Sequence, residues 1–183
     1  MTFYSKQDGA ALLVALMILT IVSILGVAAM KTSMFNAKIA TTAQVSAIAF
    51  DGAESALAAV YDEAVFESQS DPQFLVGALV TQFDPATSTG VVVERCVEKS
   101  NVRLARACAA NERADSRNLL QAGSKSVMKG LTTAPYLSTV SSAGGGGVNF
   151  AWYEFMTVGT GEVDAFNAER INEQHFAKLG PAF

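Results

Sequence analysis

A run of 21 uncharged residues near the start of the chain, Ala10–Met30, constrains the fold more than any other feature. It reads AALLVALMILTIVSILGVAAM and contains no proline. As a helix it would be about 31 Å long, which matches the hydrocarbon core of a bilayer. A buried helix of a soluble domain is rarely apolar on every face. The run therefore predicts a membrane-spanning helix rather than a core helix.

The overall composition narrows the class of protein further. The 183 residues are 50% hydrophobic and 16% charged, against about 25% charged in an average soluble domain. The net charge of −4 argues against a protein whose whole surface binds nucleic acid. The high hydrophobicity argues against disorder as the main state. Length and composition favour one span joined to one ordinary domain.

Helical features continue beyond the apolar run. No proline occurs between it and Pro72, and the segment between them is rich in alanine. Apolar residues recur at helical spacing and predict one buried face: Ile39, Ala43, Ala47, Phe50, Ala53, Leu57, Val60 and Ala64. Asp71-Pro72 is a helix stop. We predict one helix that is apolar on all sides over 10–30 and amphipathic over 31–67.

The residues alone leave three interpretations of the run: a cleaved secretory signal peptide, a single-span anchor, and a helix that is kept after a short polar leader ending in Gly9 is removed. Lys6 could serve as the basic region of a signal peptide, and Val27-Ala28-Ala29 as its cleavage site. The helical pattern crosses that site without a break, which disfavours cleavage there. Lys6 before the run and Lys31 and Lys38 after it do not decide the orientation.

Two short segments carry a family resemblance. Residues 6–9 read KQDG and are followed by AALLVAL, while residues 49–57 read AFDGAESAL. Both segments resemble the type IV pilins, most closely their PilX-type minor subunits. The resemblance implies an α+β, pilin-like fold. In that fold a long N-terminal helix, transmembrane in its first half and amphipathic in its second, packs on an antiparallel β-sheet.

The resemblance also implies processing and a location. A prepilin peptidase would cut between Gly9 and Ala10 and methylate Ala10, so that residues 1–9 form a leader on the cytoplasmic side. The protein would be a single-pass inner-membrane protein whose globular domain, residues 68–183, is periplasmic or extracellular. It would later join a pilus fibre on the cell surface. Its partners would be other minor and major pilins.

One position departs from the pattern of major pilins, which carry glutamate at the fifth mature position. Here that position is Val14. PilX-type subunits and the K-type minor pseudopilins of type II secretion share this absence, and the latter usually have a larger globular part. We expect a minor pilin of an initiation or tip complex, acting in adhesion, aggregation or twitching motility. A type II pseudopilin and a membrane-tethered binding protein or enzyme are the alternatives.

The second half of the chain predicts short strands. Candidates are Val91–Val97, Val148–Val158 and Arg170–Lys178, with Gly159-Thr160-Gly161 ending the second. An antiparallel sheet packed on the amphipathic helix is the simplest two-layer arrangement. We expect the aromatic residues of the second strand to form the core and face of this sheet, rather than a ligand platform: Phe150, Trp152, Tyr153 and Phe155.

The two cysteines, Cys96 and Cys108, would form a disulfide in a periplasmic domain. In the entropic model it would add about 3 kcal/mol to the free energy of unfolding. Two free thiols are the alternative, and a metal pair is disfavoured because His175 is the only other soft ligand.

The segment Glu94–Lys129 holds eight basic and four acidic residues. It is either a patch for an acidic partner, such as DNA or a neighbouring pilin, or a solvated helix face. The pairs Glu94–Glu98 and Arg95–Lys99 fit the i,i+4 spacing of such a helix.

No motif indicates catalysis or a cofactor. His175 is the only histidine, and no nucleophile elbow or phosphate loop accompanies it. Asp164, Asn167 and Glu169 offer three oxygen ligands without the spacing of a calcium loop. We expect a structural protein that is not an enzyme and that holds no metal or cofactor.

Overall fold

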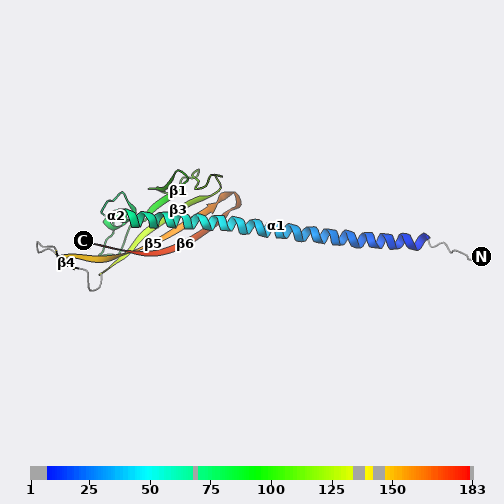
Figure 1. The fold of residues 1–183 in the computed structure, drawn as a ribbon, viewed down its shortest axis with the longest axis horizontal. Helices are drawn as coiled ribbons and strands as arrows, with labels where there is room; N and C mark the ends of the chain where they lie inside the picture. Colours follow the sequence, from blue (N-terminus) through cyan, green and yellow to red (C-terminus); the bar gives the residue numbers. More distant parts are fainter. Residues whose placement is uncertain (1–7, 68–69, 134–138, 142–146, 182–183) are drawn as a thin grey trace, which may run out of the picture. The chain divides into compact units, whose positions relative to one another are not determined.

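The computed structural model describes residues 8–67, 70–133, 139–141 and 147–181 (Figure 1). The chain forms two units, residues 1–44 and residues 45–183. Helix α1 (Asp8–Phe66) supplies all the described structure of the first unit and continues into the second. The predicted helix is confirmed, and it is continuous because no proline interrupts it. It ends at Phe66, one residue before the predicted boundary.

The second unit adds a short helix and one antiparallel sheet. The elements are α2 (Leu75–Thr81), β1 (Val93–Glu98), β2 (Asn101–Leu104), β3 (Gln121–Thr133), β4 (Thr139–Ser141), β5 (Gly147–Val163) and β6 (Ala168–Pro181). The strands pair in the order β2-β1-β3-β5-β6, and β4 pairs with the first residues of β5. A 3₁₀ turn, Asp164–Phe166, and the left-handed Asn167 join β5 to β6. The predicted α+β class, a long helix on an antiparallel sheet, is confirmed.

Both helices of the second unit cover one face of the sheet. Val60 of α1 and Leu79 of α2 pack with Tyr153 and Phe155 of β5 in the largest buried cluster. Each of these side chains is at most 2% exposed. Trp152 points to the opposite face and is 38% exposed, because successive residues of a strand alternate between faces. Of the four aromatic residues of this strand, Tyr153 and Phe155 are core residues, Trp152 lies on the outer face, and Phe150 is half-buried.

Two glycines of β5 let α1 approach the sheet closely. A Cβ atom on Gly161 would lie 2.0 Å from the carbonyl oxygen of Ala49, and one on Gly159 would lie 2.5 Å from that of Ala53. Neither approach is possible for a residue with a side chain. The prediction that these glycines end the strand is therefore wrong, since β5 runs through them to Val163.

The buried face of α1 differs from the predicted stripe in its first half. The predicted Ile39, Ala43, Ala47 and Phe50 are exposed, whereas Ala53, Leu57, Val60 and Ala64 are buried. Val45, Ala49 and Gly52 are buried instead. Contacts with the sheet begin at Val45, and close approach there requires small residues. The space between α1 and the sheet, rather than the hydropathy of each residue, therefore decides which residues of this part of α1 are buried.

Helix α2 was not predicted, because the region after Pro72 suggested only strands and loops. Its six residues from Leu75 to Val80 are all buried. The run is apolar and contains a glycine, so composition cannot separate a short helix from a short strand. Tertiary contact decides, since the amide of Leu75 donates to the buried carboxylate of Glu63 at 2.8 Å.

Candidate functional site

The first unit exposes an apolar helix on every side. All residues of α1 from Ala10 to Gln44 are solvent-exposed. Among the described helices, α1 is the one long and apolar enough to cross a membrane. Exposed apolar surface on this scale marks contact with lipid or protein. This helix is therefore the principal candidate for the functional surface.

The polar groups inside the apolar run are satisfied within the helix. The hydroxyl of Thr20 donates to the carbonyl oxygen of Met17 at 2.8 Å, and that of Ser23 donates to Leu19 at the same distance. Because an unsatisfied polar group is costly in hydrocarbon, these bonds make the run compatible with a lipid or protein interior.

The residues of the predicted cleavage site lie in the first turn of this helix. Gly9 and Ala10 belong to α1, while residues 1–7 of the predicted leader lie outside the described residues. No carboxylate occurs between Gly9 and Phe50, and Val14 is exposed. This half of α1 cannot supply the acidic group that major pilins carry. Cleavage between Gly9 and Ala10 stays a prediction.

The second half of α1 is tied to the sheet by a buried ion pair. The guanidinium of Arg95 on β1 donates from two nitrogens to the two carboxylate oxygens of Glu63, each at 3.0 Å. Their side chains are 6% and 5% exposed. Glu63 was not among the residues predicted from the sequence, although its position next to Ala64 and three residues after Val60 places it on the apolar stripe.

The end of α1 is held by side chains from two further strands. Lys178 on β6 donates to the carbonyl oxygens of Ala64 and Glu67, which the last helical turn leaves free. Burial lowers the pKa of the Lys178 ammonium below its usual range. Arg103 on β2 pairs with Asp62 and Glu67. The helix end therefore has a fixed place against the sheet.

A disulfide joins Cys96 on β1 to Cys108, with their Cα atoms 4.9 Å apart. It closes the loop that contains β2. Glu112 lies beside it, paired with the Arg106 guanidinium and accepting a hydrogen bond from the Ala109 amide. These interactions lower the pKa of Glu112 to about 2. The disulfide and the Arg106–Glu112 ion pair thus both hold this loop.

The interpretation of the basic segment 94–129 as a helix face is wrong. Strands β1, β2 and β3 occupy much of it, and the rise of about 3.3 Å per residue in a strand places residues i and i+4 roughly 13 Å apart. Five of its eight basic residues pair with carboxylates: Arg95 with Glu63, Arg103 with Asp62 and Glu67, Arg106 with Glu112, Arg113 with Asp164, and Lys125 with Glu94. Within the described residues, Lys99, Arg117 and Lys129 have no ion-pair partner. Little positive charge in this segment therefore remains available to an acidic partner.

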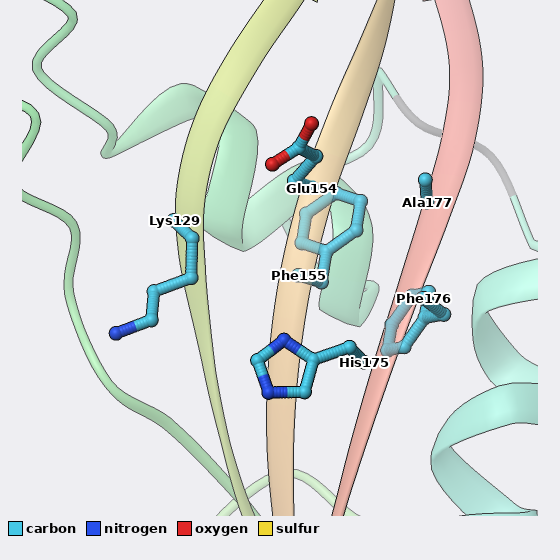
Figure 2. Close-up of a pocket in the computed structure, with 6 residues that line it drawn as sticks. All are labelled: Lys129, Glu154, Phe155, His175, Phe176 and Ala177. Atoms are coloured by element: carbon cyan, nitrogen blue, oxygen red, sulfur yellow. The ribbon is translucent and has the colours of Figure 1, made fainter.

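An open hollow of about 300 Å³ lies on the sheet over β3, β5 and β6 (Figure 2). It is lined by Lys129, Glu154, Phe155, His175, Phe176 and Ala177. The Phe155 and Phe176 rings stack with their centroids 5.1 Å apart. His175 Nε2 lies 2.7 Å from the Glu173 carboxylate, two residues away on the same strand. No serine or cysteine among the described residues hydrogen-bonds His175, so the hollow shows no pair of nucleophile and base.

Each of the three oxygen ligands near the β5–β6 turn has a structural role of its own. Asp164 pairs with Arg113 at 2.5 Å. Asn167 forms the left-handed turn residue, and Glu169 pairs across the strands with Glu162. Burial, together with the neighbouring acids, raises the pKa of Glu162 above its usual range. The arrangement is that of a turn supported by one ion pair.

Comparison with protein families matches residues 8–58 to the PilX N-terminal model. No curated protein and no solved structure matches the chain significantly. The matched residues all lie in α1, and they include the apolar run and the AFDGAESAL segment. The family recognition therefore rests on this helix.

Proposed function

We propose, from the PilX N-terminal segment at residues 8–58, that this protein is a minor pilin that takes part in type IV pilus assembly. The match supports a PilX-family type IV pilin, and this family is structural rather than enzymatic. The initiation or tip complex of the fibre is the place we propose for it. Adhesion, aggregation and twitching motility would depend on the protein through the pilus.

The proposed processing gives the exposed helix two successive environments. Before cleavage between Gly9 and Ala10, the run Ala10–Met30 anchors the protein in the inner membrane, with the domain on the periplasmic side. After a prepilin peptidase has removed the leader and methylated Ala10, the helix is free to leave the bilayer. It then packs among the apolar helices of other minor and major pilins. A helix that is exposed and apolar on every side suits both environments.

The position of Val14 supports a special place in the fibre. In major pilins a glutamate at this position is thought to contact the amino terminus of a neighbouring subunit. A subunit without it lacks one polar contact in the apolar bundle. Such a subunit fits the first or terminal position better than a repeated position along the shaft.

A minor pseudopilin of type II secretion is the competing assignment, and the PilX match favours the pilus. A deletion strain tests this choice through surface fibres and secretion. We expect loss of fibres with normal secretion, restored by the wild-type gene. Normal fibres with loss of secretion would reverse the assignment, and no effect on either would favour a tethered periplasmic protein.

Complementation with glycine variants tests the role of processing. Gly9→Ala should fail to restore fibres. Gly26→Ala is the matched control, since a Cβ atom on Gly26 meets nothing within 4 Å, and it should restore them. Equal restoration by both variants would contradict the proposed role of Gly9.

A further inference from the structure

The only charged residues between Asp8 and Asp51 are two lysines. Lys31 and Lys38 are seven residues apart, so they lie on one face of α1. Both are exposed, and neither has an ion-pair partner in the part of the chain that the structure describes. A stretch of more than forty residues therefore carries its whole charge, +2, on one strip of helix surface.

Two large apolar side chains lie between these lysines on the same face. Met34 and Phe35 are three and four residues after Lys31, and they are 54% and 66% exposed. All four residues line one hollow of about 260 Å³ on the helix surface. We refer to Lys31, Met34, Phe35 and Lys38 as the lysine face. Cations beside exposed apolar groups are typical of helix surfaces that lie in the interfacial layer of a membrane.

The lysine face begins where the apolar run ends. If Ala10–Met30 fills the hydrocarbon core, Lys31 lies at its boundary and Lys38 lies about 10 Å further along the helix. The headgroup layer begins at this boundary, and a lysine side chain can extend along the helix to place its ammonium group there. Met34 and Phe35 would then reach the upper acyl chains.

We propose that the lysine face binds the anionic headgroups of bilayer phospholipids on the side of the membrane that carries the globular unit. The inference rests on the proposed membrane span. The phosphate groups supply the negative charge that the surrounding sequence lacks, and the acyl chains cover Met34 and Phe35. An acidic surface on another protein would satisfy the lysines but would also have to place an apolar surface over Phe35. The contact would hold the unassembled subunit at a fixed depth and would be released on assembly.

Lipid selectivity of the reconstituted full chain tests this proposal. The probes are spin-labelled phosphatidylglycerol and phosphatidylcholine, each as a trace in phosphatidylcholine bilayers. Electron spin resonance reports the fraction of each lipid immobilised by the protein. We expect a severalfold preference for phosphatidylglycerol, because two ammonium groups in the headgroup layer attract an anionic lipid. High salt should weaken the preference.

The double variant K31Q/K38Q should lower the preference for phosphatidylglycerol to near one. The control pair K99Q/R117Q removes the same charge from two exposed residues of the second unit that have no ion-pair partner among the described residues, and it should keep the preference. No preference in the wild type, equal loss in both pairs or an unchanged preference in K31Q/K38Q would overturn the proposal. Unchanged lipid preference together with loss of surface fibres in K31Q/K38Q would assign the lysines to an acidic protein neighbour instead.

Resistance to alkaline carbonate extraction separates this inference from the proposed function. A chain that is extracted does not span the bilayer, and that result overturns both proposals. An inserted chain without headgroup preference overturns only the role of the lysine face.

Discussion

Arg95 and Glu63 form a doubly hydrogen-bonded ion pair buried between β1 and α1. The same carboxylate accepts the amide of Leu75 at the start of α2. One acidic side chain therefore joins the long helix, the sheet and the second helix. Because both side chains are buried, removal of one charge leaves the other charge buried without a partner.

Glu63→Gln should lower the free energy of unfolding by about 3 to 5 kcal/mol, the usual cost of breaking a buried ion pair. Urea unfolding followed by the fluorescence of Trp152, the single tryptophan, measures the change. Asp62→Asn is the control, since its pair with Arg103 is partly exposed, and it should cost about 1 kcal/mol or less. Equal costs for the two variants would contradict the role given to Glu63.

The existence of α1 could be predicted from sequence because its causes are local. Alanine-rich composition and the absence of proline up to Pro72 favour helix whatever the helix touches. Its buried face could not be predicted fully, since Ala49 is buried and Phe50 is exposed. That choice depends on glycines of β5 more than one hundred residues away.

Some features of the candidate site could likewise be predicted from the sequence, and others could not. The apolar run, Gly9 and Val14 could be found from the sequence, because their meaning depends on local composition and position. The partners of Glu63 and Lys178 could not be found in this way, since only the fold brings Arg95 and Ala64 to them. Likewise, five basic residues of segment 94–129 pair with carboxylates in the folded chain, and in four of these pairs the carboxylate lies on another element.

Substitution of Gly161 tests the close approach of α1 to the sheet. Gly161→Ala should lower the free energy of unfolding by roughly 1 to 3 kcal/mol or more, because the new methyl group overlaps the backbone of Ala49. Gly130→Ala is the matched control in β3, where an added Cβ meets nothing within 4 Å. Thermal unfolding of the two variants compares them directly. A Gly161→Ala protein as stable as Gly130→Ala would contradict the contact.

Loss of the disulfide should weaken the second unit. The double variant Cys96→Ser/Cys108→Ser should unfold with about 3 kcal/mol less free energy, because the loop of the unfolded chain is no longer closed. Reducing agent should destabilise the wild type by a similar amount and leave the variant unaffected. Equal sensitivity of both proteins to reductant would show that the effect does not come from this bond.

The ion pair beside the disulfide predicts an acid-dependent loss of stability. Hydrogen bonds from Arg106 and from the Ala109 amide lower the pKa of Glu112 from 4.5 to about 2. A carboxylate with a lowered pKa stabilises the fold above its ordinary pKa, and this stabilisation is lost as the pH falls through the folded-state value. The free energy of unfolding should therefore decline between about pH 4.5 and pH 2.

Glu112→Gln should make this decline shallower, because the side chain no longer takes up a proton on unfolding. Arg106→Gln, which removes the donor, should change the pH curve in the same direction. Urea unfolding at a series of pH values measures both. An acid limb identical to the wild type in both variants would exclude the pair as its source.

The mass of the mature amino terminus tests the central claim, that α1 is a processed pilin helix, most directly. Protein isolated from the membrane of its own cells should begin at a methylated Ala10, and Gly9→Ala should retain all nine leader residues. A wild-type chain that begins at Met1 would indicate a plain anchor. A chain that begins at Met30 would indicate removal of the apolar run as a signal peptide, and either result would contradict the account.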